Sequence, residues 1–318
     1  MKKTGLLLIV LCFNFIAFAQ TPANTIVVDR NGTGNFRNIQ QAIDSVRAFN
    51  PAGTVTIFIK KGVYKEKLEI PTHVCNVRLV GEDRDKTIIN YDDHANIKKM
   101  GTFKTFTLKI CGNDIRLENL TVENSAAQLG QAVALHVEGD RVVFVNCRFL
   151  GNQDTIYTGK ENSRQYFQNC YIEGTTDFIF GPSTSWFENC EIHCKRNSYI
   201  TAASTPEIVK FGYIFNKCNI TLADSVKAVY LGRPWRAFAM TLYMNCQLPK
   251  GIQPIGWDNW KKVENEKTTR YMEYNNSGES ANTKQRVTWE KILTKKEAAE
   301  YTVENVLKGF DGWNPQKQ

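Results

Sequence analysis

The sequence predicts an all-β protein, a right-handed parallel β-helix (a solenoid) with short helical caps at its ends. Three observations lead to this fold class. A short motif recurs through the middle of the 318-residue chain at intervals of 20 to 28 residues. The repeated segments alternate apolar and polar residues and show no helical period. Both ends of the chain depart from the repeat, as the capping segments of a solenoid do.

The repeat is a β-prone segment that ends in an Asn-Cys pair. Aligned examples are Val143-Phe-Val-Asn-Cys-Arg, Tyr166-Phe-Gln-Asn-Cys-Tyr and Trp186-Phe-Glu-Asn-Cys-Glu. The aligned cysteines lie at positions 147, 170, 190, 218 and 246, so their spacings are 23, 20, 28 and 28. Successive coils pair in parallel at about 4.8 Å. We therefore expect a buried ladder of cysteines and, near the turns, a ladder of asparagines whose side chains bond backbone groups.

The two ends read as caps. Residues 36–49 have apolar side chains at helical spacing and are predicted to cover the N-terminal coil. Residues 294–308 begin with Thr294 and Glu297, the spacing of a capping box, and are predicted to form a C-terminal helix. No linker or change of composition interrupts residues 20–318, which we interpret as one domain.

The N-terminus has the features of an export signal. Lys2 and Lys3 precede an apolar run, residues 5–18, that is short for a membrane span and ends in Ala17-Phe18-Ala19. We interpret residues 1–19 as a signal peptide; the alternative is a single membrane anchor. The prediction is a secreted or periplasmic protein with no membrane association after the signal is removed.

Composition narrows the choice of ligands. The formal net charge is +8, and removal of two lysines with the signal lowers it to +6, which suits an acidic ligand. Nucleic acid is not expected, because no basic run is interleaved with aromatic residues. The eight cysteines outside the signal form no CxxC pair, and four histidines are scattered, so neither a metal nor a cofactor is predicted. No oligomerisation element is apparent, and a monomer is the default.

The repeat also brings reactive groups together. Gln131, Asp154 and Asp177 are separated by 23 and 23 residues, the local coil length from Cys147 to Cys170. They are predicted to form a column on one outer face, about 4.8 Å apart along the axis, with Gln153 beside it. Neighbouring carboxylates do not both ionise easily, so one is expected to hold a proton while the other stays charged. Gln amides can donate to an oxyanion, so the column suits hydrolysis of an ester or a glycoside.

Aspartates at solenoid turns are often only solvated turn residues. The surrounding sequence favours function here, because Asp177 lies in Thr175-Thr-Asp-Phe-Ile-Phe-Gly181 among aromatic residues. Asp154 also precedes an apolar run. A carboxylate is costly to place among apolar groups unless something uses it.

Four ordered blocks resemble the signature motifs of the pectin methylesterases. They are Gln131-Ala-Val-Ala-Leu135, Gly151-Asn-Gln-Asp-Thr-Ile156, Asp177-Phe-Ile-Phe-Gly181 and Leu231-Gly-Arg-Pro-Trp235. The resemblance continues through Lys61-Gly-Val-Tyr-Lys-Glu66 and Gly256-Trp-Asp-Asn-Trp260, so it covers essentially the whole chain after the signal. It implies the β-helix fold and hydrolysis of the methyl esters of pectin (methylated homogalacturonan), without a cofactor.

The resemblance also implies catalytic roles. Asp177 would be the nucleophile that attacks the ester carbonyl, and Arg233 would pair with it and keep it ionised. Gln131 and Gln153 would form the oxyanion hole. Asp154 would protonate the departing methanol and then take a proton from water.

Further positions match the family's substrate contacts. Trp235 would form a wall of the sugar-binding groove, Phe180 would line the same cleft, and Thr102 falls where the family has a substrate-contacting threonine; Gln131 and Arg233 would also touch the substrate. Trp257 and Trp260 are interpreted as packing residues. The family contains disulfides at rungs such as those of Cys170 and Cys190; a reduced ladder is the alternative.

Other functions fit less well. A polygalacturonase would pair carboxylates on motifs absent here, and a lyase would need a calcium-binding acidic cluster, for which Asp92 and Asp93 lie outside the column. A serine esterase is disfavoured because no G-x-S-x-G elbow is present. A non-catalytic polysaccharide-binding β-helix gives no reason for two aspartates, two glutamines and an arginine to occur together. The remaining alternatives are an esterase of the same family acting on another ester and a pectin-depolymerising enzyme.

Overall fold

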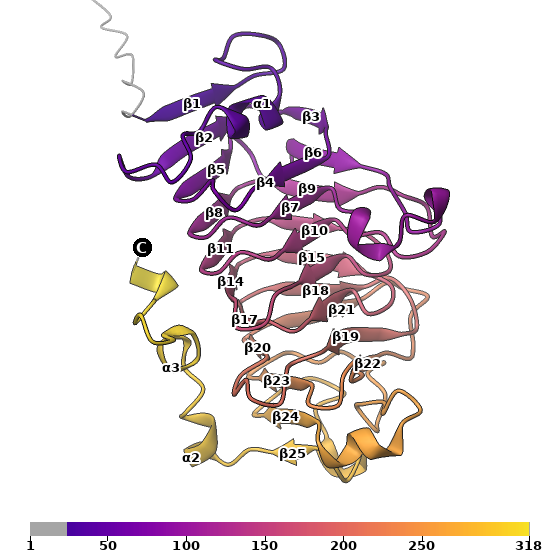
Figure 1. The fold of residues 1–318 in the computed structure, drawn as a ribbon. Helices are drawn as coiled ribbons and strands as arrows, with labels where there is room; N and C mark the ends of the chain where they lie inside the picture. The colour runs from indigo at the N-terminus through magenta and orange to yellow at the C-terminus, as the bar shows by residue number, and fades with distance from the viewer. Residues whose placement is uncertain (1–23, 318) are drawn as a thin grey trace, which may run out of the picture.

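The computed structural model describes residues 24–317, and the predicted signal peptide lies outside them. Within these residues the chain winds into a parallel β-helix whose coils stack from the N-terminal to the C-terminal end (Figure 1). The predicted fold class is confirmed. No helix in the described part of the chain is long and apolar enough to cross a membrane.

Three parallel sheets form the walls of the coil. The first has 11 strands in the order β1 (Thr25–Val28), β2 (Val55–Ile59), β5 (Val77–Gly81), β8 (Ile115–Glu118), β11 (Val142–Val145), β14 (Arg164–Gln168), β17 (Thr184–Glu188), β20 (Tyr213–Asn216), β23 (Met240–Met244), β24 (Arg270–Tyr274) and β25 (Lys291–Ile292). The second, which we name the cleft sheet, has seven strands: β4 (Leu68–Ile70), β7 (Leu108–Ile110), β10 (Leu135–Val137), β13 (Ile156–Thr158), β16 (Ile179–Gly181), β19 (Tyr199–Ala203) and β22 (Tyr230–Gly232). The third also has seven: β3 (Gly62–Lys65), β6 (Thr87–Tyr91), β9 (Thr121–Asn124), β12 (Arg148–Leu150), β15 (Tyr171–Gly174), β18 (Glu191–Cys194) and β21 (Asn219–Leu222).

A stack of aromatic rings fills the coil beneath the 11-stranded sheet. Phe144, Phe167, Phe187, Phe215 and Tyr243 are register partners on successive strands, and all are fully buried. Their ring centroids are 4.4 to 4.6 Å apart with nearly parallel planes. Each coil adds one rung to the sheet, so one aromatic position per repeat builds a continuous core along the axis.

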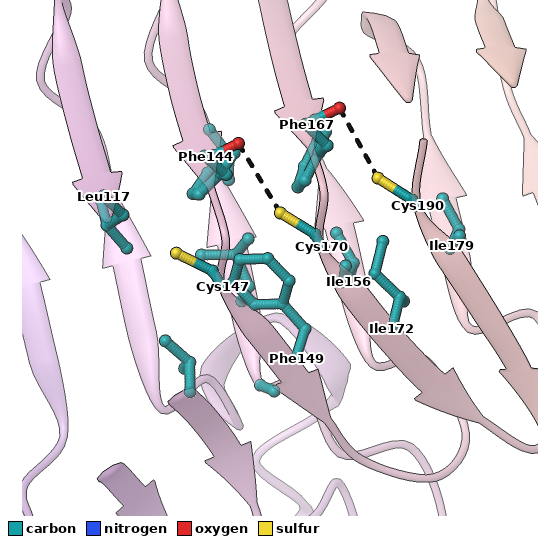
Figure 2. Close-up of a cluster of buried hydrophobic side chains, with 14 of the residues drawn as sticks. Leu117, Phe144, Cys147, Phe149, Ile156, Phe167, Cys170, Ile172, Ile179 and Cys190 are labelled. Carbon is teal, nitrogen blue, oxygen red and sulfur yellow. Dashed lines mark hydrogen bonds between the residues drawn. The ribbon is translucent and has the colours of Figure 1, made fainter. Parts of the chain in front are cut away.

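The predicted cysteine ladder runs beside this stack (Figure 2). The Cys170 thiol donates to the Phe144 carbonyl at 3.6 Å, and the Cys190 thiol donates to the Phe167 carbonyl at 3.6 Å. Residues 24–317 contain eight cysteines, all as free thiols. The structure therefore has the reduced ladder, with small side chains and weak donors filling the core.

An asparagine directly after each of four strands of the 11-stranded sheet, β8, β11, β14 and β17, turns the chain. Asn119, Asn146, Asn169 and Asn189 have φ values between 50 and 54°, in the left-handed region that asparagine tolerates better than most residues. The Asn146 side-chain amide donates to the side-chain oxygen of Asn119 one coil away at 2.8 Å, so this link joins two side chains and does not bond a backbone group as predicted. These turns join the strands of the 11-stranded sheet to those of the third sheet at the same place in successive coils.

The end segments are helical but shorter than predicted. At the N-terminal end, α1 (Ile39–Asp44) buries Ile39, Ala42 and Ile43 against the first coil. The single helix expected over 294–308 is instead two, α2 (Lys295–Ala298) and α3 (Val303–Leu307), because Thr302 caps a second start by accepting from the Asn305 N–H. α3 packs against β17, so this segment runs back along the 11-stranded sheet (Figure 1).

Short 3₁₀ turns occur in the loops: η1 (Ile97–Lys99), η2 (Thr102–Lys104), η3 (Val263–Lys267), η4 (Thr283–Gln285) and η5 (Pro315–Lys317). η1 and η2 lie in the connection between β6 and β7. This connection carries Thr102 toward the cleft sheet.

A buried ionic cluster lies in the last coils. The side chains of Arg286, Glu273 and Glu290 are 3, 2 and 1% exposed, and Arg286 Nε is 2.5 Å from Glu273 Oε1 but 3.9 Å from Glu290 Oε2. Burial, followed by the charge of Glu273, raises the pKa of Glu290 from its ordinary 4.5 to about 9. Glu290 is therefore a neutral acid in the folded protein near pH 7.

We expect Glu290→Gln to stabilise the protein increasingly as the pH rises from about 5 to about 9. Over this window the unfolded chain releases the Glu290 proton and the folded chain keeps it, so wild-type stability falls with pH. Glutamine has no such proton, and the Tm advantage should reach at least about 2 °C by pH 8. The check is the Tm of variant and wild type across this pH range, with the exposed Glu279→Gln as control. A Tm difference independent of pH would contradict the assignment.

Candidate active site

The eight residues predicted to form a site lie around one cleft of about 270 Å³. It is lined by Thr102, Phe103, Gln131, Gln153, Asp154, Asp177, Phe180, Ala202, Arg233, Trp235 and Trp260. Phe180 and Ala202 are register partners on β16 and β19, which places the cleft on the outer face of the cleft sheet.

The two aspartates stand at the same level of adjacent rungs. Each lies two residues before the start of its strand, Asp154 before β13 and Asp177 before β16, and these strands pair Ile156 with Ile179. The predicted column is correct for this pair. It is wrong in detail for Gln131, because β10 and β13 pair Leu135 with Ile156, an offset of 21 residues instead of 23. Gln131 therefore lies two positions before the rung partner of Asp154, although it still lines the cleft.

Both aspartates occupy a left-handed backbone. Their φ values are 66° at Asp154 and 50° at Asp177, a region that few non-glycine residues adopt. The turns are held by backbone hydrogen bonds, from Asp154 N–H to the Thr176 carbonyl at 3.1 Å and from Asp177 N–H to the Tyr199 carbonyl at 2.9 Å. Such conformations occur preferentially at functional sites.

Arg233 binds only one of the two carboxylates. Its Nε donates to Asp177 Oδ1 at 2.9 Å and its Nη2 donates to Asp177 Oδ2 at 2.6 Å, a bidentate pair. Gly232, the residue before Arg233, lets β22 pack closely on β19, because a Cβ there would lie 2.0 Å from the Thr201 hydroxyl oxygen. The Arg233 N–H donates to the Thr201 carbonyl at 2.9 Å and joins the end of β22 to β19.

The environment separates the two carboxyl groups electrostatically. Burial, and then the charge of Asp177, raises the pKa of Asp154 well above its usual range. Burial also raises the pKa of Asp177, but the hydrogen bonds and charge of Arg233 oppose this rise. Asp154 is thus the better proton donor of the pair, and Asp177 the better anion.

Aromatic side chains form the walls. Phe180 lies 5.8 Å from the ring of Trp235 and 4.9 Å from that of Tyr157, and Phe103 lies 4.9 Å from Tyr157 on the other side. Trp260 covers the guanidinium of Arg233 at 3.8 Å. Flat apolar faces around a small polar centre suit a sugar ring that presents a polar group to the aspartates.

A family model for pectinesterases matches residues 25–310. The chain belongs to the pectinesterase family. The family match and the pectinesterase relatives described below identify the chain as a carboxylic ester hydrolase.

Known pectinesterases agree with this assignment in sequence and in structure. The chain is 36% identical over 285 residues to pectinesterase 31 of Arabidopsis thaliana, covering 86% of this chain and 89% of that protein. Some relatives are longer: the chain is 37% identical over 302 residues to a pectinesterase/pectinesterase inhibitor of Brassica campestris, covering 89% of this chain and 52% of that protein. Among solved structures, the pectin methylesterase from carrot has a TM-score of 0.87 and 30% identity over 92% of this chain and 96% of that one. A pectin methylesterase in complex with a hexasaccharide has a TM-score of 0.76 and 29% identity, with 91% of this chain and 98% of that one covered.

Sequence reasoning missed part of this pectinesterase cleft. Trp257 is fully buried, as expected of a packing residue, but Trp260 lines the cleft. Phe103 was not singled out, because it lies in the long connection between β6 and β7, outside the repeat. Tyr157, which does not line the cleft but packs on Phe103 and Phe180, could have been found, since it follows Asp154 by three residues as Phe180 follows Asp177.

A larger groove of about 590 Å³ lies on the outer face of the 11-stranded sheet and is the weaker candidate. Its arginines are already paired with acids: Arg78 and Arg116 with Glu118, and Arg141 with Asp114. The residues that line this groove include neither a pair of carboxylates nor an aromatic side chain.

We expect Asp154→Asn to raise the Tm by about 2 to 4 °C at pH 7 while giving no gain below about pH 4. The buried Asp154 carboxyl holds its proton more strongly than the unfolded chain does, so it disfavours folding once the pH exceeds its ordinary pKa. Asparagine removes this penalty. Thermal melts at the two pH values, with the exposed Asp224→Asn as control, measure it. An equal Tm gain at both pH values would count against a raised pKa of Asp154.

Proposed function

We propose that this protein hydrolyses the methyl esters of polygalacturonate, releasing methanol and leaving pectate. The observation that carries the proposal is the asymmetry of the aspartate pair: Asp177 has a bidentate arginine, and Asp154, level with it on the next rung, has none. The relatives are pectinesterases, and one is known in complex with a hexasaccharide, which supports a polymeric uronate as the substrate.

In the first half of the reaction, an oxygen of the Asp177 carboxylate attacks the ester carbonyl carbon. The side-chain amides of Gln131 and Gln153 donate hydrogen bonds to the oxyanion that develops. The bond from the carbonyl carbon to the methoxy oxygen breaks, and Asp154 gives its proton to that oxygen, so methanol leaves. Asp177 is then joined to the substrate acyl group as an anhydride.

In the second half, water resolves the anhydride. The Asp154 carboxylate, deprotonated by the first half, takes a proton from water as its oxygen attacks the anhydride. The bond from the acyl carbon to the Asp177 oxygen breaks, the galacturonic acid group that forms loses its remaining proton to solvent and leaves as a carboxylate, and both aspartates return to their starting states. Arg233 keeps the displaced Asp177 carboxylate ionised and oriented throughout.

Substrate positioning falls to the remaining cleft residues. We assign Trp235 and Phe180 as faces for sugar rings and Thr102 as a polar contact, while Gln131 and Arg233 also touch the reacting residue. The scheme uses no metal and no cofactor. Export through residues 1–19 would deliver the enzyme, as a secreted or periplasmic monomer, to pectin outside the cytoplasm.

A panel of esters tests the substrate class. Residues 20–318 are incubated with highly methylated pectin and, separately, with acetylated polysaccharides, and methanol and acetate are measured. The proposal predicts methanol from pectin and acetate release at least about a hundred times slower. In pectin the sugar carries the acyl group that Asp177 attacks, whereas in an acetylated polysaccharide the sugar is the leaving alcohol, so a cleft that binds the sugar as the acyl part disfavours the acetyl ester. Acetate as the principal product would identify an esterase for a different ester.

A further inference from the structure

Four flat groups stack through the centre of the site. The ring of Tyr230 packs on that of Tyr199, with centroids 5.1 Å apart and planes inclined by 23°. Tyr199 lies 4.0 Å beneath the guanidinium carbon of Arg233, and Trp260 lies 3.8 Å from the same atom. The cation of Arg233 therefore contacts two aromatic rings as well as the carboxylate of Asp177.

The tyrosine layers come from the β-helix itself. Tyr199 and Tyr230 are register partners at the starts of β19 and β22. The carbonyl of Tyr199 also accepts the Asp177 N–H at 2.9 Å. Tyr199 thus binds the backbone of Asp177 through its carbonyl and contacts the guanidinium of Arg233 through its ring.

The tryptophan layer is held by an unusual turn. Trp260 and Lys261 have φ values of 61 and 56°, which are outliers for side chains of this size. The Asp258 carboxylate accepts the Trp260 N–H at 2.7 Å, and the Asp258 N–H donates to the Gly232 carbonyl at 3.2 Å. The turn is therefore attached to the residue before Arg233, and strain of this kind persists where the surroundings impose it.

We propose that Tyr199 and Trp260 are positioning residues that clamp the plane of the Arg233 guanidinium, so that Nε and Nη2 face the two oxygens of Asp177 together. A bidentate pair needs the guanidinium and carboxylate to share a plane, and a free arginine side chain samples many others. With the rings of Tyr199 and Trp260 against its faces, the Arg233 guanidinium is confined to the plane that it shares with the Asp177 carboxylate. This inference rests on the proposed role of Asp177 and adds two residues that do not themselves touch the reacting atoms.

The test is Tyr199→Leu, which removes one ring and keeps an apolar side chain. We expect kcat for methanol release to fall about tenfold, with KM changed less than about twofold, because the loss of one cation–π face affects orientation and not sugar binding. Looser pairing with Arg233 raises the pKa of Asp177, so the acid limb of the kcat profile should move to higher pH by about half a unit. Tyr199→Phe keeps the ring and is expected to restore most of the rate.

Two results would overturn the clamp: an unchanged kcat and acid limb in folded Tyr199→Leu, or an equal loss in Tyr199→Phe, which would assign the effect to the hydroxyl. Thermal melts report folding, and if Tyr199→Leu does not fold, Trp260→Leu applies the criteria for kcat and the acid limb, but not that for KM, to the other ring, because Trp260 lines the cleft. Asp177→Ala measured in parallel separates the two levels of the account. A fully active Asp177→Ala would refute the proposed nucleophile, whereas an inactive one beside an unaffected Tyr199→Leu would refute only the clamp.

Discussion

Asp177→Ala is expected to lower methanol release from methylated pectin by about four orders of magnitude, the scale seen when a member of a catalytic unit is removed. The substitution deletes the carboxylate that we propose as the nucleophile and leaves Arg233 without its partner. Binding of the polymer should persist, because the aromatic walls are untouched. Methanol release and retention on a pectate column measure the two effects separately.

Asp177→Asn provides the matched comparison, because asparagine has the same shape and tolerates the left-handed backbone at this position. It should be as inactive as the alanine variant unless slow deamidation restores aspartate, which mass spectrometry of the peptide would reveal. Asp224→Ala, at an exposed position, is the control for the preparation. Methanol release within about tenfold of wild type by folded Asp177→Ala would contradict a nucleophilic role, since that loss is far smaller than such a role requires.

Arg233→Lys is expected to reduce kcat by about a hundredfold although the charge is kept. Lysine is a point charge and cannot make the two parallel hydrogen bonds that Arg233 makes with Asp177. The weaker pair leaves burial as the main influence on Asp177, so its pKa rises further. The acid limb of the rate profile should therefore move to higher pH. Kinetics over a range of pH measure both changes.

The exposed Arg196→Lys serves as control for Arg233→Lys, because it makes the same chemical change away from the cleft. A rate and acid limb equal to those of wild type in Arg233→Lys would show that charge alone suffices. In that case neither the bidentate hydrogen bonds nor the aromatic clamp that orients them would be needed for the rate.

The parts of the site that the sequence predicted are those fixed by the repeat. Asp154 and Asp177 are 23 residues apart, β13 and β16 are offset by the same number, and so the pair is level. The equal spacing of Gln131 was misleading, because the coil from β10 to β13 has an offset of 21 residues, two fewer than the coil from β13 to β16. Spacing predicts a rung only where the coil length is constant.

The parts that were missed depend on loops. Trp260 reaches Arg233 through a left-handed turn after the repeat ends, and Phe103 enters from the connection between β6 and β7. Neither position follows a period. Tyr199 lies on a strand, but its contact with Arg233 depends on the register of β19 with β22, an offset of 31 residues, whereas the three preceding coils of the cleft sheet have offsets of 21 to 23. The fold class could be predicted from the sequence because it depends only on the period and the β propensity of the repeat.

We expect the aspartate pair to hydrolyse methyl esters and to leave the polymer intact. The most direct measurement is methanol release from highly methylated pectin by wild-type residues 20–318, with reducing ends and absorbance of unsaturated products followed in the same sample. We expect methanol with no new reducing ends and no unsaturated product. New chain ends or unsaturated uronate without methanol would contradict it and would identify a depolymerising enzyme built on the same β-helix.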